Sequence, residues 1–398
     1  MKNIVIVNAH WSNRGDEAAL RAIIDRILEL VKDVKITIIF KEKGEILQFP
    51  YASDIEFVKL RFLPTYFQVR RAVFTKGKWM KDQDMKKTAD IVENADFVIY
   101  APGGAVISDR FWWKKQLEYL FPLAYAEKWK IPVFIAAPSI GPFHQKRRFR
   151  KKVLERVDRI CVREELSEQE LKKEVSGENV VVTIDSAFLD MPDEAVNQKK
   201  YSDDASLVRF FECYDKVVGV TVTDLGWHVE YGRQEEIKKQ IAQTFQDFIR
   251  YLGKKKIGVI LIPQLFGSQN DKEYLKGFAG ENTYLLSDGY DTYFQQYIIS
   301  KLYALVGMRY HSNIFAAKMG VPFIPVIYEE KMRGFADIAG MHEWSVELND
   351  LSAEVLERKF ARLEENIESI RKRLLQERQG WKDKAELTAK ELELFLKQ

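Results

Sequence analysis

Hydrophobic positions along this chain follow two alternating spacings. Short, almost continuous apolar runs, of which residues 3–7 are the first, are typical of strands buried on both faces of a parallel sheet. Between these runs, apolar residues recur at helical spacing, as in residues 16–31, where Ile23, Ile24 and Ile27 share one face. Strands that alternate with helices predict an α/β protein with a parallel, doubly wound sheet.

The two halves of the chain each carry a series of such elements. In the first half, strands are predicted at residues 3–7, 34–40, 55–58, 95–101, 131–137, 159–162 and 180–184, and helices at residues 16–31, 116–128 and 164–175. In the second half, strands are predicted at residues 216–223, 257–263, 284–286, 303–308 and 322–327, and helices at residues 234–252 and 312–318. Each half therefore resembles a Rossmann-like domain.

The segments that flank the second half differ from both series. Residues 192–215 are polar and weakly periodic, and we interpret them as an interdomain linker with a short helix over residues 205–212. Residues 353–397 are predicted to be helical, with Gly380 as the clearest helix breaker. Three parts follow: an N-terminal Rossmann-like domain (residues 1–195), a C-terminal Rossmann-like domain (residues 215–352) and a helical segment (residues 353–398). Two Rossmann-like domains that face a cleft, with C-terminal helices, describe a glycosyltransferase-B-like architecture.

Composition excludes several classes of protein. Hydrophobic residues make up 46% of the 398 residues, enough for substantial cores. The 62 Lys and Arg residues nearly balance the 59 Asp and Glu residues, so we predict no nucleic-acid partner. Cys161 and Cys213 are too few for a disulfide framework, and no metal site is predicted. The chain starts in a strand without a signal peptide, and no apolar run approaches the roughly 18–20 residues that span a bilayer, so we predict a cytoplasmic protein.

The most informative chemistry lies around the strand at residues 303–308. Arg309 and His311 follow this strand directly, and Lys331 and Arg333 follow the next strand. In open α/β sheets, ligands bind at the carboxyl ends of strands. Three cations and a titratable imidazole at such a place indicate an anionic substrate and a proton transfer. A lone histidine is more often structural, but this convergence favours function.

Four further segments in the first half follow predicted strands. Gly15 and Asp16 open the first long helix, where they suit an anion or where Asp16 simply caps the helix. The second segment contains the paired glycines Gly103 and Gly104, which suit either a ligand or any tight turn. The third segment contains Ser139, which lies in a rigid turn. Arg163, in the fourth, either binds a carboxylate or phosphate or pairs with Glu164, Glu165 or Asp185.

Three stretches are rich in cations. Residues 144–152 are interpreted as a solvated helix face, with a phosphate or anionic-lipid surface as the alternative. Residues 70–87 and 110–115 interleave cations with aromatic residues, which suits stacking on bases or sugars, a membrane interface or ordinary surface packing.

In their order along the chain, these motifs resemble the polysaccharide pyruvyl transferases over about residues 1–345. The resemblance is carried by residues 14–18 (RGDEA), 102–104 (PGG), 139–142 (SIGP), 162–167 (VREELS), Asp185, 308–311 (MRYH) and Lys331. It departs from the family pattern at Ala105, at Ala137 and Pro138, and at Tyr310.

The resemblance implies transfer of a pyruvyl group from phosphoenolpyruvate to two hydroxyls of a sugar, forming a ketal. It implies no cofactor beyond phosphoenolpyruvate as co-substrate. Arg163, Arg309 and Lys331, with Arg333 beside them, would bind the donor, and His311 would be catalytic. Asp16 would orient or deprotonate the acceptor, with Gly15, Gly103, Gly104 and Ser139 in the acceptor loops.

The expected partners are phosphoenolpyruvate and a sugar acceptor, in a polysaccharide or a lipid-linked precursor at the inner face of the membrane. Peripheral membrane contact and a homo-oligomer built through the C-terminal helices are compatible with the sequence. Two other functions fit the same architecture: a nucleotide-sugar-dependent glycosyltransferase, and a non-catalytic protein that binds glycans or sugar phosphates.

Overall fold

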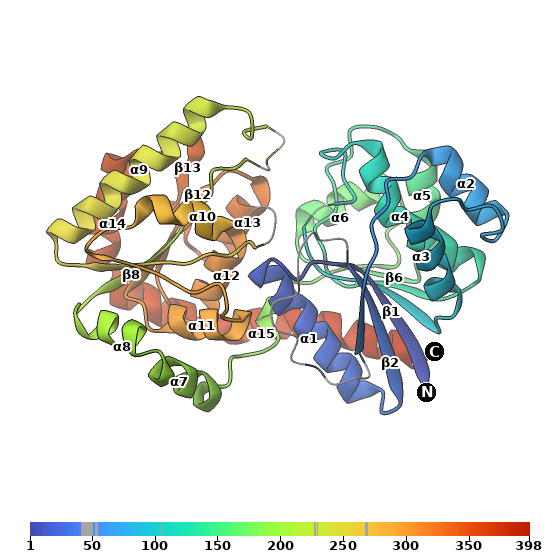
Figure 1. Cartoon of the computed structure of the whole chain (residues 1–398), viewed down its shortest axis with the longest axis horizontal. Coiled ribbons are helices and arrows are strands. Elements are labelled where there is room, and N and C mark those ends of the chain that lie inside the picture. The colour runs from blue at the N-terminus through green and yellow to red at the C-terminus, as the bar shows by residue number, and fades with distance from the viewer. Residues whose placement is uncertain (41–50, 52–54, 105, 227, 229, 267–269) are drawn as a thin grey trace. The chain divides into compact units, whose positions relative to one another are not determined.

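A computed structural model describes residues 1–398 except residues 41–50, 52–54, 105, 227, 229 and 267–269 (Figure 1). The chain forms two compact units. The N-terminal unit comprises Met1–Ser12, Asp16–Leu189 and Lys382–Gln398, and the C-terminal unit comprises Asn13–Gly15 and Asp190–Trp381. Each unit is built on a parallel sheet, as the alternation of strands and helices predicts.

The N-terminal unit contains a sheet of seven described strands in the order β3-β2-β1-β4-β5-β6-β7. The strands are β1 (Lys2–Ala9), β2 (Val34–Phe40), β3 (Ile55–Lys59), β4 (Phe97–Tyr100), β5 (Val133–Ile135), β6 (Arg159–Val162) and β7 (Val180–Val182). The helices are α1 (Arg14–Leu30), α2 (Tyr66–Phe74), α3 (Gln83–Glu93), α4 (Trp113–Lys128), α5 (Arg148–Leu154) and α6 (Glu165–Lys172).

Alternating residues of β1 supply the two cores of this unit. Ile4 and Ile6 pack in a cluster with Ile23 of α1 and Phe395 near the C-terminus. Val5 and Val7 face the opposite side and join a cluster with residues of α4. Because successive side chains of a strand point to opposite faces, an all-apolar strand requires helices on both sides.

The C-terminal unit contains a sheet of six described strands in the order β10-β9-β8-β11-β12-β13. The strands are β8 (Val217–Thr221), β9 (Gly258–Leu261), β10 (Thr283–Leu285), β11 (Ala304–Gly307), β12 (Phe323–Ile327) and β13 (Val346–Glu347). The helices are α7 (Glu194–Asp203), α8 (Ala205–Glu212), α9 (Glu235–Lys254), α10 (Asp271–Leu275), α11 (Thr292–Ser300), α12 (Tyr310–Lys318), α13 (Glu330–Ile338), α14 (Ala353–Glu365) and α15 (Ile367–Leu396).

Of the helical predictions for the two ends of this unit, one was confirmed and one placed a helix break at the wrong residue. The helix predicted over residues 205–212 is α8, but the supposed linker also contains α7. The break between the C-terminal helices falls at Asn366, whereas α15 continues through Gly380. A glycine lowers helix stability by roughly 1 kcal/mol, which the packing of this 30-residue helix outweighs. Residues of α15 belong to both units, because the division falls after Trp381.

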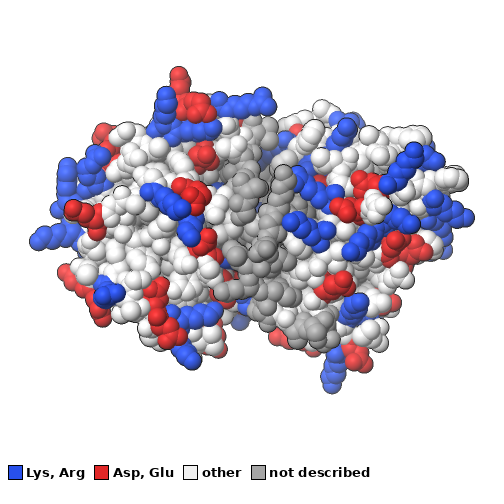
Figure 2. Space-filling view, viewed as in Figure 1, with Lys and Arg blue, Asp and Glu red and all other residues white. Residues whose placement is uncertain are grey.

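Charged side chains of both signs are interspersed over the visible face of each unit (Figure 2), as the near balance of cations and anions predicts. Among the described residues, no helix is both long and apolar enough to cross a membrane.

Candidate functional site

The predicted residues of the N-terminal unit gather at the carboxyl edge of its sheet. The strand order reverses between β1 and β4, and such a switch point is where open α/β sheets bind ligands. Asp16 follows β1, and Gly103 follows β4. Ser139 follows β5, and Arg163 follows β6. Four neighbouring strands therefore each contribute one predicted residue.

Arg163 is held in a buried ion pair. Its guanidinium donates to Asp185 Oδ2 at 2.6 Å and to Ser139 Oγ at 2.9 Å. The side chains of Arg163 and Asp185 are each 1% exposed. Of the three carboxylates considered from the sequence, Asp185 is the partner, and Arg163 anchors the loop that carries Ser139.

Asp16 lies against the glycine turn that follows β4. A Cβ atom at Gly103 would lie 3.5 Å from Asp16 Oδ1, and Gly103 has φ +148, a conformation that favours glycine. Asp16 lies within the first turn of α1 and is not its cap, because the Gly15 N–H donates to Asn13 Oδ1 at 2.9 Å. The carboxylate therefore faces the turn. Ala105, where the sequence departs from the family pattern, lies outside the described residues.

The basic run at residues 144–152 is not a uniformly solvated helix face. Arg150 is fully buried and pairs with Asp109 at 2.8 Å and with Glu174 at 2.7 Å. Burial alone raises the pKa of Asp109, but the backbone N–H of Gln145 and the Arg150 guanidinium outweigh burial and lower that pKa. Arg150 thus ties the loop after β4 to α5, and part of the prediction for this run was wrong.

Residues 13–15 group with the C-terminal unit. Asn13 forms a β-bridge with Leu265, and the Arg14 N–H donates to the Gln264 carbonyl at 2.9 Å. The Arg14 guanidinium lies over the Phe266 ring, 4.3 Å from its centroid. These contacts fix Gly15 at the carboxyl edge of the C-terminal sheet.

Gly15 lies directly against His311. A Cβ atom at Gly15 would come within 1.8 Å of His311 Cγ, so no residue with a side chain fits there without moving the imidazole. His311 is 7% exposed and lies in the first turn of α12, which begins at Tyr310 and not at Ser312 as predicted. The family resemblance implied an acceptor-loop role for Gly15, whereas in the structure Gly15 leaves room for the candidate catalytic imidazole.

Arg309 is held by Asp271 at the start of α10. The guanidinium donates to both oxygens of Asp271, with Nε 3.1 Å from Oδ2. Asp271 also accepts the N–H groups of Gln264 at 3.0 Å and Leu265 at 2.9 Å. Burial lowers the pKa of Arg309, but the carboxylate of Asp271 outweighs burial and raises it overall, so Arg309 carries a fixed positive charge.

Lys331 belongs to a cluster of charged and aromatic groups that follows β12. Its Nζ pairs with Glu329 at 2.6 Å and lies 5.6 Å from the centroid of the Tyr310 ring, which in turn lies 5.2 Å from the His311 ring. His228 Nε2 lies 3.4 Å from Glu329 Oε1. The Tyr310 ring thus connects Lys331 with His311.

Tyr328 connects this cluster with Arg309. The pKa of Tyr328 is raised, chiefly by burial and then by the charge of Glu329, while Arg309 opposes the shift. The phenol therefore remains a neutral hydroxyl at physiological pH. Arg333, in contrast, pairs with Glu347 at 2.8 Å and with Glu330.

Four residues of this cluster were missed in the sequence: Asp271, Tyr328, Glu329 and His228. Tyr328 and Glu329 directly follow β12, so the same rule that selected Arg309 would have found them. Asp271 begins α10 and His228 lies in the loop after β8, and no spacing in the sequence connects them with Arg309 or Glu329.

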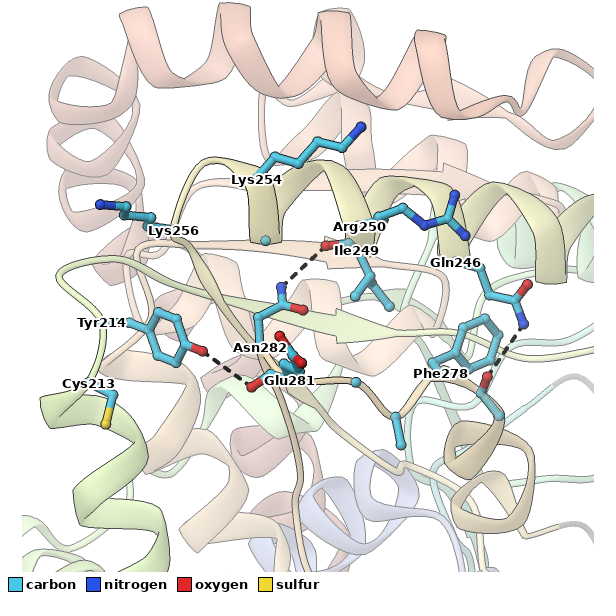
Figure 3. A pocket seen from close by; sticks show the side chains of 14 residues that line it. Cys213, Tyr214, Gln246, Ile249, Arg250, Lys254, Lys256, Phe278, Glu281 and Asn282 are labelled. Carbon is cyan, nitrogen blue, oxygen red and sulfur yellow. Dashed lines mark hydrogen bonds between the residues drawn. The ribbon is translucent and has the colours of Figure 1, made fainter.

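A cavity of about 860 Å³ lies elsewhere in the C-terminal unit (Figure 3). It is lined by residues that precede β8, β9 and β10, among them Tyr214, Lys256 and Asn282. Tyr214 donates to the Glu281 carbonyl at 3.3 Å, and Asn282 donates to the Ile249 carbonyl at 3.2 Å. The cavity therefore lies at the amino ends of the strands, opposite the edge that carries Arg309 and His311.

The fold of the chain defines its class. A UDP-GlcNAc 2-epimerase from Neisseria meningitidis is 14% identical, with 98% of this chain and 99% of that chain covered and a TM-score of 0.57. A UDP-glucosyltransferase from Polygonum tinctorium is 12% identical, with 100% and 99% covered and a TM-score of 0.58. Identities this low concern the fold alone, and they confirm the predicted glycosyltransferase-B-like class.

The family follows from sequence comparison. A family model described as polysaccharide pyruvyl transferase matches residues 13–330. The amylovoran biosynthesis protein AmsJ of Erwinia amylovora is 24% identical over 389 residues, which cover 88% of this chain and 89% of that protein. The chain belongs to the polysaccharide pyruvyl transferase family, as its motifs predicted, and it is a transferase of polysaccharide biosynthesis.

Proposed function

We propose that the chain transfers the pyruvyl group of phosphoenolpyruvate to two hydroxyls of one sugar, forming a pyruvate ketal. The acceptor is a sugar of a polysaccharide or of its lipid-linked precursor, used at the inner face of the membrane. The observation that carries this proposal is the cluster of Arg309, Lys331, Tyr328 and His311 at the carboxyl edge of the C-terminal sheet, in a chain of this family.

The cluster suits a small, highly charged donor. Phosphoenolpyruvate carries about three negative charges near pH 7, so binding requires several cations. Arg309, held by Asp271, supplies a planar guanidinium suited to carboxylate or phosphate, and Lys331 supplies a point charge. Because Lys331 pairs with Glu329, donor binding would compete with Glu329 for this ammonium group.

The reaction requires one acid step and two base steps. Protonation of the methylene carbon makes C2 electrophilic, one hydroxyl adds there, phosphate leaves, and the second hydroxyl closes the ketal. Of the two hydroxyl protons, one ends on the new methyl group and the other on the released phosphate. We assign these transfers to His311, a role typically worth about 10²–10⁴-fold in rate.

The N-terminal unit is assigned to the acceptor. Asp16 beside Gly103 provides a carboxylate that accepts hydrogen bonds from sugar hydroxyls. The resemblance assigned Arg163 to the donor, but its full burial and its pair with Asp185 favour a role in positioning the Ser139 loop. Arg333 pairs with carboxylates on α13 and β13, so we assign it a role in stabilising α13 and not in contacting the donor.

Phosphate release from phosphoenolpyruvate, measured with a panel of sugar and lipid-linked sugar acceptors, tests the function. We expect turnover with at least one acceptor and a loss of about 10²–10⁴-fold in kcat for His311→Gln. Mass spectrometry of the product identifies the ketal. His342→Gln, at an exposed histidine that pairs with Asp337, is the matched control and should retain activity.

Binding and turnover measurements on the same purified protein distinguish the proposed function from the two alternatives. A glycosyltransferase would be stabilised against thermal unfolding by a uridine or guanosine diphosphate and would release no phosphate from phosphoenolpyruvate. A non-catalytic binding protein would bind glycans without turnover. Full activity of His311→Gln would exclude the proposed role of the imidazole even if phosphoenolpyruvate is consumed.

A further inference from the structure

Three segments of the N-terminal unit contain cations without carboxylates, although the two kinds of charge balance over the whole chain. Residues 57–81 contain seven Lys and Arg residues and no Asp or Glu. Residues 110–117 contain three such cations, and residues 144–154 contain six, of which Arg150 is buried against Asp109 and Glu174; neither segment itself contains an acidic residue. Positive charge is therefore segregated in these segments.

The three segments form one surface. The Tyr66 ring of α2 packs edge-on against Phe149 of α5, with centroids 5.6 Å apart. The Arg147 guanidinium lies over the Trp113 ring at the start of α4, 4.7 Å from its centroid. Figure 1 shows α2, α4 and α5 on the same side of the N-terminal sheet. We call the surface of residues 61–81, 110–114 and 144–152 the basic-aromatic face.

Large aromatic side chains stand exposed on this face. Phe67 is 71% exposed, Phe74 83%, Trp79 63% and Trp112 66%. The opposite side of α2 packs into the core through Val69 and Ala72. Helix α2 therefore has apolar residues on two sides: one side is buried in the protein, and the other exposes phenyl rings to water. Exposed apolar groups of this kind mark interaction surfaces.

The cations of the face lie among these rings. The Arg71 guanidinium lies 5.6 Å from the centroid of Trp79, and the Arg70 guanidinium lies 5.9 Å from that of Tyr66. Figure 2 shows blue side chains along the outer edge of the N-terminal unit, where Figure 1 places α2. Guanidinium and ammonium groups that alternate with aromatic rings match a membrane interface, where rings enter the acyl boundary and cations meet anionic headgroups.

We propose that the basic-aromatic face docks on an anionic membrane. A glycan partner fits less well, because sugar hydroxyls are bound largely by acceptors such as carboxylates, which these segments lack. A nucleic-acid partner fits less well because phenyl rings as exposed as Phe74 gain most from an apolar medium.

The position of the face suits a lipid-linked acceptor, an argument that rests on the proposed function. Each of the three segments follows the carboxyl end of a strand: β3, β4 or β5. The loops with Gly103 and Ser139 follow β4 and β5 and lead directly into α4 and α5. Docking would therefore bring the membrane to the edge of the sheet that carries the acceptor loops.

Co-sedimentation with vesicles tests the docking without reference to activity. We expect the full chain to bind vesicles of phosphatidylcholine with 30% phosphatidylglycerol, to bind pure phosphatidylcholine weakly, and to release at high salt. Arg70→Glu with Arg71→Glu should weaken binding by about tenfold or more, since basic residues near an anionic surface each contribute to the attraction. Phe67→Ala with Phe74→Ala should weaken binding while leaving the charge unchanged.

The matched control is Lys239→Glu with Lys254→Glu, which makes the same change of charge on exposed positions of α9 in the other unit. Equal loss of binding in this control would reduce the effect to net charge and overturn the proposal. Two other results would also overturn the proposal. One is wild-type protein that stays in the supernatant at low salt. The other is a phenylalanine variant that binds vesicles as well as the wild type does, while all variants bind a polyanion resin equally. The arginine variant should still turn over a water-soluble acceptor. Its loss of vesicle binding can then be distinguished from a failure of the proposed pyruvyl transfer.

Discussion

The carboxyl edges of the two sheets carry the same motif, a buried Arg–Asp pair, in different surroundings. In the N-terminal unit the side chains of Arg163 and Asp185 are each 1% exposed, and Arg163 also donates to Ser139. In the C-terminal unit Arg309 is 11% exposed, and Lys331, in the same cluster, is 20% exposed. We therefore propose that the same pair of residue types anchors a loop in the N-terminal unit and takes part in ligand binding in the C-terminal unit, where the arginine is more exposed.

The largest expected effect separates the two arginines. Arg163→Met should lower the free energy of unfolding by about 3–5 kcal/mol, because the buried charge of Asp185 loses its guanidinium partner, although Asp185 still accepts the Ala187 N–H. Arg309→Met should cost less stability, because Asp271 keeps two backbone N–H donors, but should lower kcat/KM for phosphoenolpyruvate by about a hundredfold. Chemical denaturation and phosphate-release kinetics measure the two quantities.

A double variant sharpens the test of Arg163. Arg163→Met with Asp185→Leu removes both charges and should recover part of the lost stability. If Arg163→Met instead keeps wild-type stability and loses only affinity for phosphoenolpyruvate, Arg163 belongs to the donor site as the family resemblance implied.

The next effect concerns the fit of His311 in the C-terminal cluster. Gly15→Ala should lower kcat by about 10²-fold, because the new methyl group displaces the imidazole and misplacement by about 1 Å costs this much. Gly380→Ala is the matched control: no atom lies within 4 Å of its Cβ position. It should keep full activity and gain about 0.5–1 kcal/mol of stability, because α15 is helical there. Unchanged kinetics in Gly15→Ala would show that the imidazole position is not critical.

A smaller effect is expected at the glycine turn beside Asp16. Gly103→Ala should cost about 1–3 kcal/mol of stability because of its φ of +148, and it should raise KM for the acceptor. Gly104→Ala meets no atom within 4 Å and has no such conformation, so it should be nearly neutral. Thermal unfolding and acceptor titrations distinguish the two variants. Identical behaviour would remove the turn from the acceptor site.

The smallest effect is a pH dependence of stability in the N-terminal unit. The pKa of Asp109 is lowered in the folded state from its ordinary 3.8, so its ion pair stabilises the fold above about pH 4. This contribution is lost as pH falls through the folded pKa. Wild type should therefore be more stable than Asp109→Asn near neutral pH, and denaturation curves below pH 3.8 should converge. A difference that stays constant with pH would mean that Asp109 acts through packing.

Much of the candidate site was predictable because it follows a positional rule. Asp16, Gly103, Ser139, Arg163 and Arg309 each come shortly after a predicted strand, and parallel strands end at one edge of a sheet. Asp271 escaped prediction because its partner Arg309 is 38 residues away. Arg150 was misread for a related reason, because a helical segment dense in cations gives no sign that one of them is buried between two carboxylates.

The sequence by itself determined the two α/β series, the family and the cations and imidazole at the strand ends, because periodicity and local motifs are properties of neighbouring residues. The tertiary structure alone decided which charges are matched by carboxylates, which glycine accommodates His311, and how three basic segments form one face. These depend on the packing of residues far apart in the chain. Arg163 and Arg309 look alike in the sequence, and only their surroundings, set by the folding of each unit, distinguish their roles.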